Sequence, residues 1–284
     1  MFGKLMKYEI RGNSKVLFPA FGLGIGGGLI LQLCSKILNG FSERIGGMAE
    51  QLFSAIVGLY AGAVAVFGIG YIVVRFYRSM VGREAYLTLT LPVGNTLHVA
   101  AKFVSGFGFG LLSLAAARLT YWTYAPTSLF GLSWKQGELQ FYESLTGGQW
   151  LQMNGMILLF LAVMVAFLLM ELFFCCGIGS QFKSKVVASV VTYFVAHNAV
   201  GLVGLVALVL GLNGLGENRI PQWVDELMAE ISGVAMMGGE AAVFGRIMGL
   251  AWIVVLVYAL YSLLWGAGYF FVTRHMFNKR VNLD

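Results

Sequence analysis

Charged residues are scarce in this sequence. Asp, Glu, Lys and Arg together make up 11% of its 284 residues, whereas hydrophobic residues make up 58%. A soluble core cannot bury that much apolar surface, so the composition excludes a soluble globular protein and predicts an all-α polytopic membrane protein. We therefore interpret the net charge of +6 as a determinant of membrane orientation and expect no nucleic-acid partner.

Motifs for nucleotide or catalytic chemistry are also lacking. The sequence contains no GxxxxGK(S/T) segment, so the chain cannot cradle nucleotide phosphates by itself. Its three histidines, His98, His197 and His275, lie in distant segments without an HExxH motif or a nucleophile dyad. We expect that the chain is not an enzyme and binds no cofactor of its own.

The sequence contains three cysteines, and their positions indicate packing residues. Cys175 and Cys176 are adjacent and have no further Cys or His at metal-ligand spacing, so no metal site is expected. Cys34 follows Leu33, where a lipoprotein signal requires a small residue. The first apolar segment also has no small-x-small cleavage site after it, so we expect no signal peptide.

Long apolar segments are what the sequence contains instead. A bilayer core about 30 Å thick requires about 20 apolar residues per helix. Six segments nearly free of charge meet this requirement: residues 16–38, 51–74, 99–122, 150–176, 186–212 and 247–272. The third carries Lys102 and Arg118 near its ends, from which long cationic side chains reach the headgroups. The sequence therefore predicts six transmembrane helices in a single domain, residues 1–284.

Glycines recur inside these segments. Gly22, Gly24 and Gly27 form a GxGxxG pattern, but they lie within the first apolar segment and no strand precedes them. Small residues at such spacing let transmembrane helices approach closely. We predict close helix packing at these glycines, and also at Gly106 and Gly110 in the third segment.

Basic residues are concentrated in alternate loops. Loops rich in Lys and Arg tend to stay cytosolic, so we predict that both termini are cytosolic and that the loop 213–246 is external. In that external loop, residues 221–231 have the pattern of a short amphipathic helix. Thirteen of the 19 basic residues fall on the predicted cytosolic side: Lys4, Lys7, Arg11, Lys15, Arg75, Arg78, Arg83, Lys102, Lys183, Lys185, Arg274, Lys279 and Arg280.

The first residues differ from a transmembrane segment. In residues 2–12, apolar and basic side chains recur on separate faces of a helix. Such a helix would lie in the cytosolic membrane interface with its cations toward anionic lipid. Gly12, Asn13 and Ser14 then predict a break before the first span. An interfacial helix of an exporter and an ordinary topology anchor would both give this pattern.

Three polar residues lie inside predicted spans. Glu171 falls in the cytosolic third of the fourth span, and His197 and Asn198 lie near the middle of the fifth. Such groups cost a few kcal/mol in a bilayer unless they are paired or solvated. We expect Glu171 to pair with Lys183, Lys185 or a partner subunit. We expect His197 and Asn198 to hydrogen-bond across helices or to line a substrate path.

The segment 75–97 separates the second and third spans. Arg75 and Arg78 mark the membrane exit, and Gly82 permits a turn. Three leucines then alternate with threonine before Pro92. An apolar segment exposed to the cytosol is unfavourable unless something covers it, and a partner protein or the membrane surface would do so.

Four segments resemble those of a known family, the membrane subunits of bacterial type-2 ABC exporters. The segment RFYRSMVGREAYLTLTLPVG, residues 75–94, is similar to the family's YxxxxGxExYLxxTLP-like loop. FGKLMKYEIRG at residues 2–12 resembles its interfacial helix. GIGSQFKSKVVASVVTYF at residues 177–194 and VTRHMFNKRVNLD at residues 272–284 are similar to its fourth loop and its basic ending.

The resemblance implies a function. In such exporters two permease halves form the pathway, and a separate cytosolic ATPase that holds ATP and Mg drives it from the bacterial cytoplasmic side. Arg83 departs from the family, in which an acidic or amide residue often precedes the Glu. The residues that the resemblance assigns to ATPase coupling are Arg83, Glu84, Ala85, Tyr86, Leu87 and Pro92.

Two other classes of protein fit the same spans. A membrane scaffold or immunity protein would need no ATPase. A secondary transporter or channel would normally carry more interior charge than Glu171 and His197, or helices broken at the midplane. The sequence does not specify a cargo, and peptides, lipids and hydrophobic antibiotics remain open.

Overall fold

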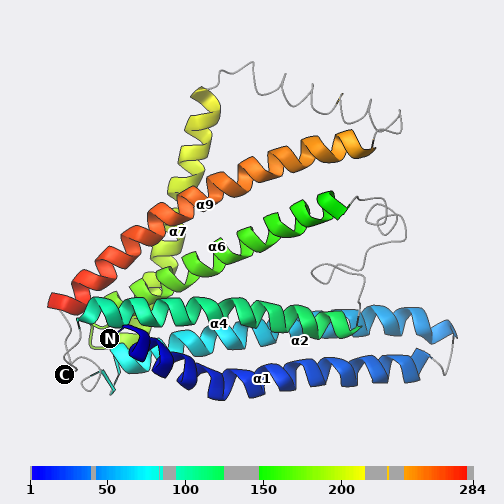
Figure 1. The fold of residues 1–284 in the computed structure, drawn as a ribbon, viewed down its shortest axis with the longest axis horizontal. Coiled ribbons are helices and arrows are strands. Elements are labelled where there is room, and N and C mark those ends of the chain that lie inside the picture. The colour runs from blue at the N-terminus through cyan, green and yellow to red at the C-terminus, as the bar shows by residue number, and fades with distance from the viewer. Residues whose placement is uncertain are drawn as a thin grey trace.

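The described part of the chain consists of long helices. The structure, a computed structural model, describes residues 2–39, 43–82, 84–85, 94–124, 147–214, 229 and 240–279. No strand occurs in these residues, and each of the six long helices could cross a membrane by its length and composition. They are α1 (Phe2–Asn39), α2 (Glu43–Met80), α4 (Asn95–Tyr124), α6 (Gly147–Gly179), α7 (Lys185–Gly214) and α9 (Glu240–Lys279) (Figure 1). The prediction of an all-α, six-span membrane protein is therefore confirmed.

All six described helices extend beyond the predicted spans at both ends. α2 has 38 residues, and at a rise of 1.5 Å per residue it is about 57 Å long, nearly twice the thickness of a bilayer core. α9 begins at Glu240, so residues 240–246 belong to this helix and not to the loop that was predicted to end at residue 246. The expected short helix at 221–231 lies, apart from Ala229, outside the described residues.

The predicted break at Gly12, Asn13 and Ser14 is wrong. α1 continues as one helix from Phe2 to Asn39. The hydroxyl of Ser14 donates to the Arg11 carbonyl at 3.1 Å, and Asn13 is 3% exposed. These residues stay helical because their side of α1 packs against the neighbouring helices, which outweighs their weak intrinsic helix propensity. The location of residues 2–12 in the membrane interface stays a prediction.

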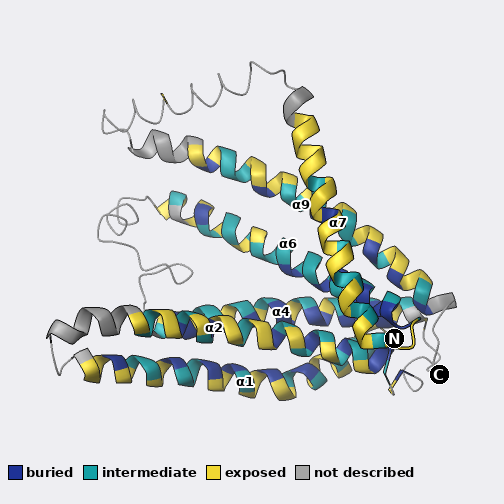
Figure 2. Cartoon of the chain, turned by 180° about the vertical axis from the view of Figure 1, so that it is seen from behind, coloured by how far each residue is buried: buried dark blue, intermediate teal, exposed yellow. Residues whose placement is uncertain are grey.

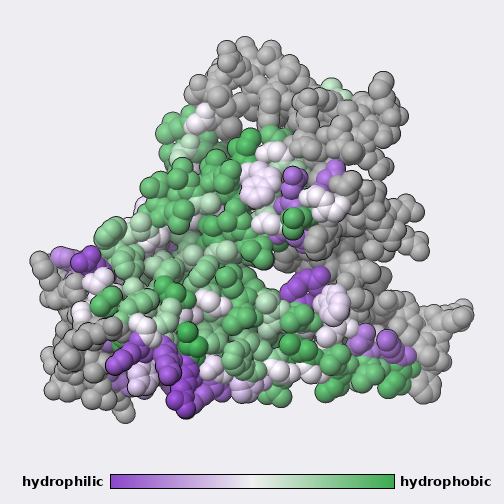
Figure 3. Space-filling view, in the orientation of Figure 1, coloured by the Kyte–Doolittle hydropathy of each residue, from purple (hydrophilic) through white to green (hydrophobic). Residues whose placement is uncertain are grey.

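The helices form two groups that meet at one end. α1, α2 and α4 lie side by side, while α6 packs against both α9 and α7 (Figures 1 and 2). α1 begins, α2 ends, α4 begins and α9 ends at the same end of the molecule (Figure 1). We call this the basic end, because Lys4, Lys7, Arg75, Arg78 and Arg274 belong to the helix ends that gather there. Hydrophilic side chains cover the surface there, near the start of α1 (Figure 3).

One buried apolar cluster joins the two groups near the basic end. The Phe76 ring of α2 stacks on the Phe173 ring of α6, with centroids 3.8 Å apart and planes 7° from parallel. Phe277 of α9 meets Phe76 edge-on at 6.1 Å. Leu17 of α1 and Val99 of α4 belong to the same cluster. The cluster therefore contains side chains from every described long helix except α7.

Glycines allow the close helix contacts. A Cβ on Gly24 would lie 2.9 Å from Val64 of α2, and one on Gly106 would lie 2.9 Å from Ile72. A Cβ on Gly110 would come within 2.7 Å of Val165 of α6. The prediction of close packing is confirmed at these positions and at Gly27, where a Cβ would overlap the Tyr60 side chain. It is wrong for Gly22, where a Cβ would meet no atom of a described neighbouring helix within 4 Å.

α7 differs from the other helices in its exposure. It packs on α6, and Tyr261 of α9 donates a hydrogen bond to its Val200 carbonyl, but it diverges from α1, α2 and α4 (Figures 1 and 2). Exposed residues run along nearly its whole length in Figure 2. Its exposed large apolar residues include Val186, Val190, Phe194, Leu202, Leu205, Leu208 and Leu210.

Candidate functional site

The segment 75–97, which was assigned to coupling, overlaps the neighbouring helices: residues 75–80 belong to α2 and residues 95–97 to α4. The N–H groups of Val81 and Gly82 both donate to the Tyr77 carbonyl, at 2.8 and 2.9 Å, which closes the helix C-terminus. The Ala85 N–H donates to the Gly82 carbonyl at 3.0 Å, and this hydrogen bond closes a turn after the helix.

Two of the six predicted coupling residues are described. Glu84 is exposed, whereas the neighbouring Ala85 is fully buried. This part of the segment thus has a buried residue beside an exposed one. The other four, Arg83, Tyr86, Leu87 and Pro92, lie outside the described residues.

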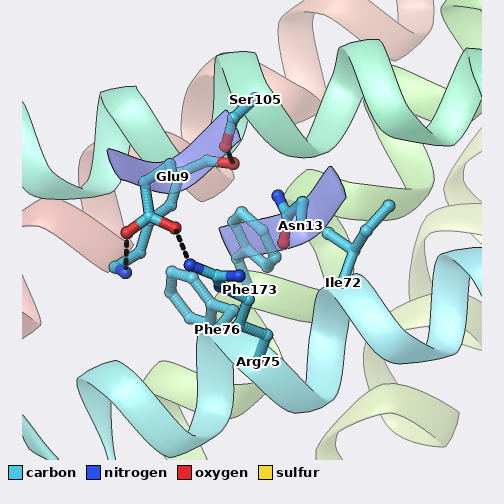
Figure 4. A pocket seen from close by; sticks show the side chains of 8 residues that line it. Glu9, Asn13, Ile72, Arg75, Phe76, Ser105 and Phe173 are labelled. Carbon is cyan, nitrogen blue, oxygen red and sulfur yellow. Dashed lines mark hydrogen bonds and ion pairs between the residues drawn. The ribbon is translucent and has the colours of Figure 1, made fainter. Parts of the chain in front are cut away.

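A cluster of charges lies where α1, α2 and α4 meet. Glu9 of α1 places one carboxylate oxygen 2.5 Å from Lys102 Nζ of α4 and the other 3.4 Å from Arg75 Nη2 of α2. Figure 4 shows Glu9 facing Arg75, with dashed lines marking the two ion pairs. The Lys102 side chain is 7% exposed and the Glu9 side chain 17%. We call Glu9, Arg75 and Lys102 the ionic cluster.

The backbone of α1 is shaped for this cluster. A Cβ on Gly12 would overlap the Arg75 guanidinium, so this close approach requires a glycine. Next to it, Asn13 Oδ1 is buried and has no hydrogen-bond partner among the described residues. Phe76 and Phe173 form the adjacent apolar wall (Figure 4). The ionic cluster therefore lies directly beside the aromatic contact that connects α2 to α6.

A groove opens next to the ionic cluster. Its volume is about 450 Å³, and it lies between the start of α1, the end of α2 and the start of α4. Leu5, Tyr8, Tyr71 and Val74 line its less polar part. The ionisable residues that line the rest are Glu9, Arg75, Arg78, Glu84, His98 and Lys102.

The predicted intramembrane polar residues are only partly brought together. Glu171 of α6 is fully buried, and its Oε2 lies 3.3 Å from His197 Nδ1 of α7. The Asn198 amide instead donates to the Phe194 carbonyl of its own helix at 2.7 Å. The partner of Glu171 in the structure is therefore His197, where the sequence suggested Lys183, Lys185 or a partner subunit, and the contact joins two helices. The His197 side chain remains 58% exposed.

The structure also places the cysteines that the sequence assigned to packing. Cys175 and Cys176 are 2% and 6% exposed, as predicted for packing residues. Within the described residues, no group of His, Cys, Asp or Glu side chains has the arrangement of a metal site.

Sequence reasoning missed Glu9 as a site residue. A usable signal was present, because Glu9 is the only acid in the first 42 residues and lies among four cations. Its partner Lys102 was recognised as an unusual charge within a span, but the two are 93 residues apart. No protein-family model, curated protein or solved structure matches the chain, so the likeness to ABC exporters comes from the four segments alone.

Proposed function

We propose that the chain is one half of the transmembrane domain of an ATP-driven exporter in the bacterial cytoplasmic membrane. A second permease half completes the pathway, and a cytosolic ATPase that holds ATP and Mg docks on the segment 75–97. The observation that carries this proposal is the ionic cluster. It ties together the two helices that flank the segment, α2 and α4, and joins both of them to α1.

This arrangement suits the transmission of a mechanical signal. A displacement of the segment pulls on the end of α2 and the start of α4. Because Glu9 bonds to both helices, α1 must follow. The Phe76–Phe173 stack then passes the motion to α6. Packed interiors transmit such displacements because they have low compressibility.

A coupling element has to contact the partner and to be fixed to its own protein, and Glu84 and Ala85 suit these two roles. The exposed carboxylate of Glu84 is accessible to a partner, and the buried Ala85 fixes the segment to the protein. A partner that pushes on Glu84 therefore moves the anchored backbone next to it.

The exposed surface of α7 favours the proposal of a second permease half. His197 and Asn198 are exposed halfway along a helix whose outer side is otherwise apolar. An exposed amide and imidazole are costly against lipid tails, but a partner helix or a hydrated pathway would solvate them. We assign this side of α7 to the contact with the second half or to the pathway.

The proposal is tested by co-purification. The tagged protein is isolated from its native membrane in mild detergent, and the bound proteins are identified by mass spectrometry. We expect a stoichiometric protein with a nucleotide-binding P-loop. Glu84→Ala and Leu87→Asp should each lose it while the protein stays folded. Arg274→Ala, which changes an exposed cation at the same end but on α9, is the matched control and should retain it.

Two results would decide against the proposal. If both segment variants retain the ATPase at the wild-type level, the assignment of the segment to coupling is wrong. If the folded wild-type protein reproducibly carries no such ATPase, the membrane scaffold or immunity protein becomes the better interpretation.

A further inference from the structure

The groove beside the ionic cluster has an excess of positive charge. Among the described residues, Arg75, Arg78 and Lys102 line it together with two carboxylates, those of Glu9 and Glu84. Glu9 uses one oxygen for Arg75 and the other for Lys102, so two cations share one negative charge. Arg78 forms no ion pair with any other residue of the described ranges.

The basic side chains of the groove lie on two helices that face it. Arg75 and Arg78 are three residues apart on α2, and His98 and Lys102 are four apart on α4, so each pair lies on one side of its helix. The two sides line the same groove. Guanidinium groups present forked N–H donors that match the oxygens of a phosphate.

His98 supplies the second observation. The residue is 3% exposed and lines the groove, and its Nε2 is buried without a hydrogen-bond partner in the part of the chain that the structure describes. A buried ring nitrogen left without a partner costs free energy that a ligand oxygen would recover when this nitrogen carries a proton. Lys102, also nearly buried, has further N–H donors beyond the one directed to Glu9.

We propose that this groove binds a phosphate-bearing anion, with the phosphodiester of a membrane phospholipid as the first source to test. A phosphodiester carries one negative charge, which equals the excess of the three cations over the two carboxylates in the lining. The remaining lining fits a headgroup site at the membrane boundary. Tyr8 and Tyr71 are amphipathic, and Leu5 and Val74 offer apolar contact for the glycerol and the first acyl carbons.

The site does not depend on the exporter assignment. A bound phosphate would touch α1, α2 and α4 at the point where the ionic cluster joins them, and would partly neutralise its excess charge. The expected consequence is a tighter contact between the three helices at the basic end. Stability of the protein should therefore respond to the lipid headgroup.

The test uses the purified full-length protein in detergent and two probes. The first probe is phosphatidylglycerol added in mixed micelles, with phosphatidylcholine as the lipid of no net charge. The second is inorganic phosphate. Thermal unfolding reports stabilisation, and native mass spectrometry counts retained lipid. Arg78→Gln removes one exposed groove cation without breaking the ionic cluster, and Arg274→Gln removes an exposed cation outside the groove.

We expect phosphatidylglycerol to raise the unfolding temperature and to be retained as a single adduct. Arg78→Gln should weaken this binding about tenfold or more, as expected for a charge-assisted hydrogen bond, while Arg274→Gln should leave it unchanged. If inorganic phosphate gives the same Arg78-dependent stabilisation, the site takes a free phosphate. If neither probe binds, or if both variants weaken binding equally, the groove is not an anion site and the inference is wrong.

Discussion

Glu9 is the only acid among the described residues that pairs with either Lys102 or Arg75. Lys102 is almost entirely buried, so water reaches its ammonium only through the groove and replaces the carboxylate poorly if the pair is broken. An unpaired buried charge is far more costly than the net gain from forming the pair. The contacts of a single residue therefore control how α1, α2 and α4 are held together.

We predict that Glu9→Gln destabilises the protein on the order of 3 kcal/mol, because it leaves the Lys102 ammonium buried without a counter-ion. Thermal unfolding in detergent measures the effect. The double variant Glu9→Gln with Lys102→Met should recover part of the loss, since it removes the unpaired charge together with its partner. A wild-type unfolding temperature for Glu9→Gln alone would contradict the assignment of Glu9 as the counter-ion.

At the residue scale, the sequence predicted unusual charges but not their partners. Lys102, Glu171 and His197 could each be singled out because ionisable groups are costly inside a span. A contact between helices was one of two expectations for His197, and the structure places it 3.3 Å from Glu171. Glu9 escaped notice because it lies in an amphipathic segment where an acid is ordinary, and its role follows from a contact 93 residues away.

At the scale of the elements, helix packing depends on glycine. We predict that Gly28→Ala destabilises the protein by about 1–3 kcal/mol through overpacking. A Cβ at this position of α1 would lie 2.8 Å from the Thr120 carbonyl oxygen of α4, and backbone cannot yield as a flexible side chain can. The two helices would have to separate. Thermal unfolding in detergent, or loss of monodispersity on gel filtration, measures the effect.

The matched control for this prediction lies in the same helix. Gly26→Ala places a Cβ where no atom lies within 4 Å, so it should be neutral or slightly stabilising, because alanine has the higher helix propensity. Equal effects of the two substitutions would mean that helix propensity, and not the contact between α1 and α4, determines the outcome.

The number and type of the elements could be predicted because each span needs a long apolar run, which is a local property of the chain. The continuity of α1 through Gly12 and Asn13 could not be predicted from the sequence, because it depends on packing against Arg75 and its neighbours. Local propensity favours a break there, and tertiary contacts override it. The same distinction applies to glycines, since the GxGxxG pattern does not reveal that Gly22 faces no neighbour while Gly24 meets Val64.

At the scale of the whole molecule, the two groups of helices are joined at the basic end. The contacts of α6 with α2 and α4 through Phe173 and Gly106 lie in the halves of these helices near that end, and the contact through Gly110 lies at the middle of α4. The ionic cluster, the groove and the segment after α2 are located there too. A partner or ligand that binds at this end therefore acts where the two groups are connected.

The orientation of the whole chain gives a final prediction. Six spans require the start of α1 and the end of α9 to be on the same side of the membrane, and the structure places them at the same end (Figure 1). The excess of basic residues predicts that this side is cytosolic. We expect a green fluorescent protein fused at either terminus to fluoresce. Alkaline phosphatase should be active only when it is inserted near residues 40–42, 125–146 or 215–239.

Different outcomes would contradict the predicted orientation and the predicted number of spans. Phosphatase activity at both termini would show that the orientation is the reverse of the predicted one, with six spans retained. The groove would then face outside the cell, where a cytosolic ATPase cannot reach it. Opposite signals at the two termini would instead require an odd number of spans. In that case at least one helix, with α7 the first to examine because of its exposure, would not cross the membrane.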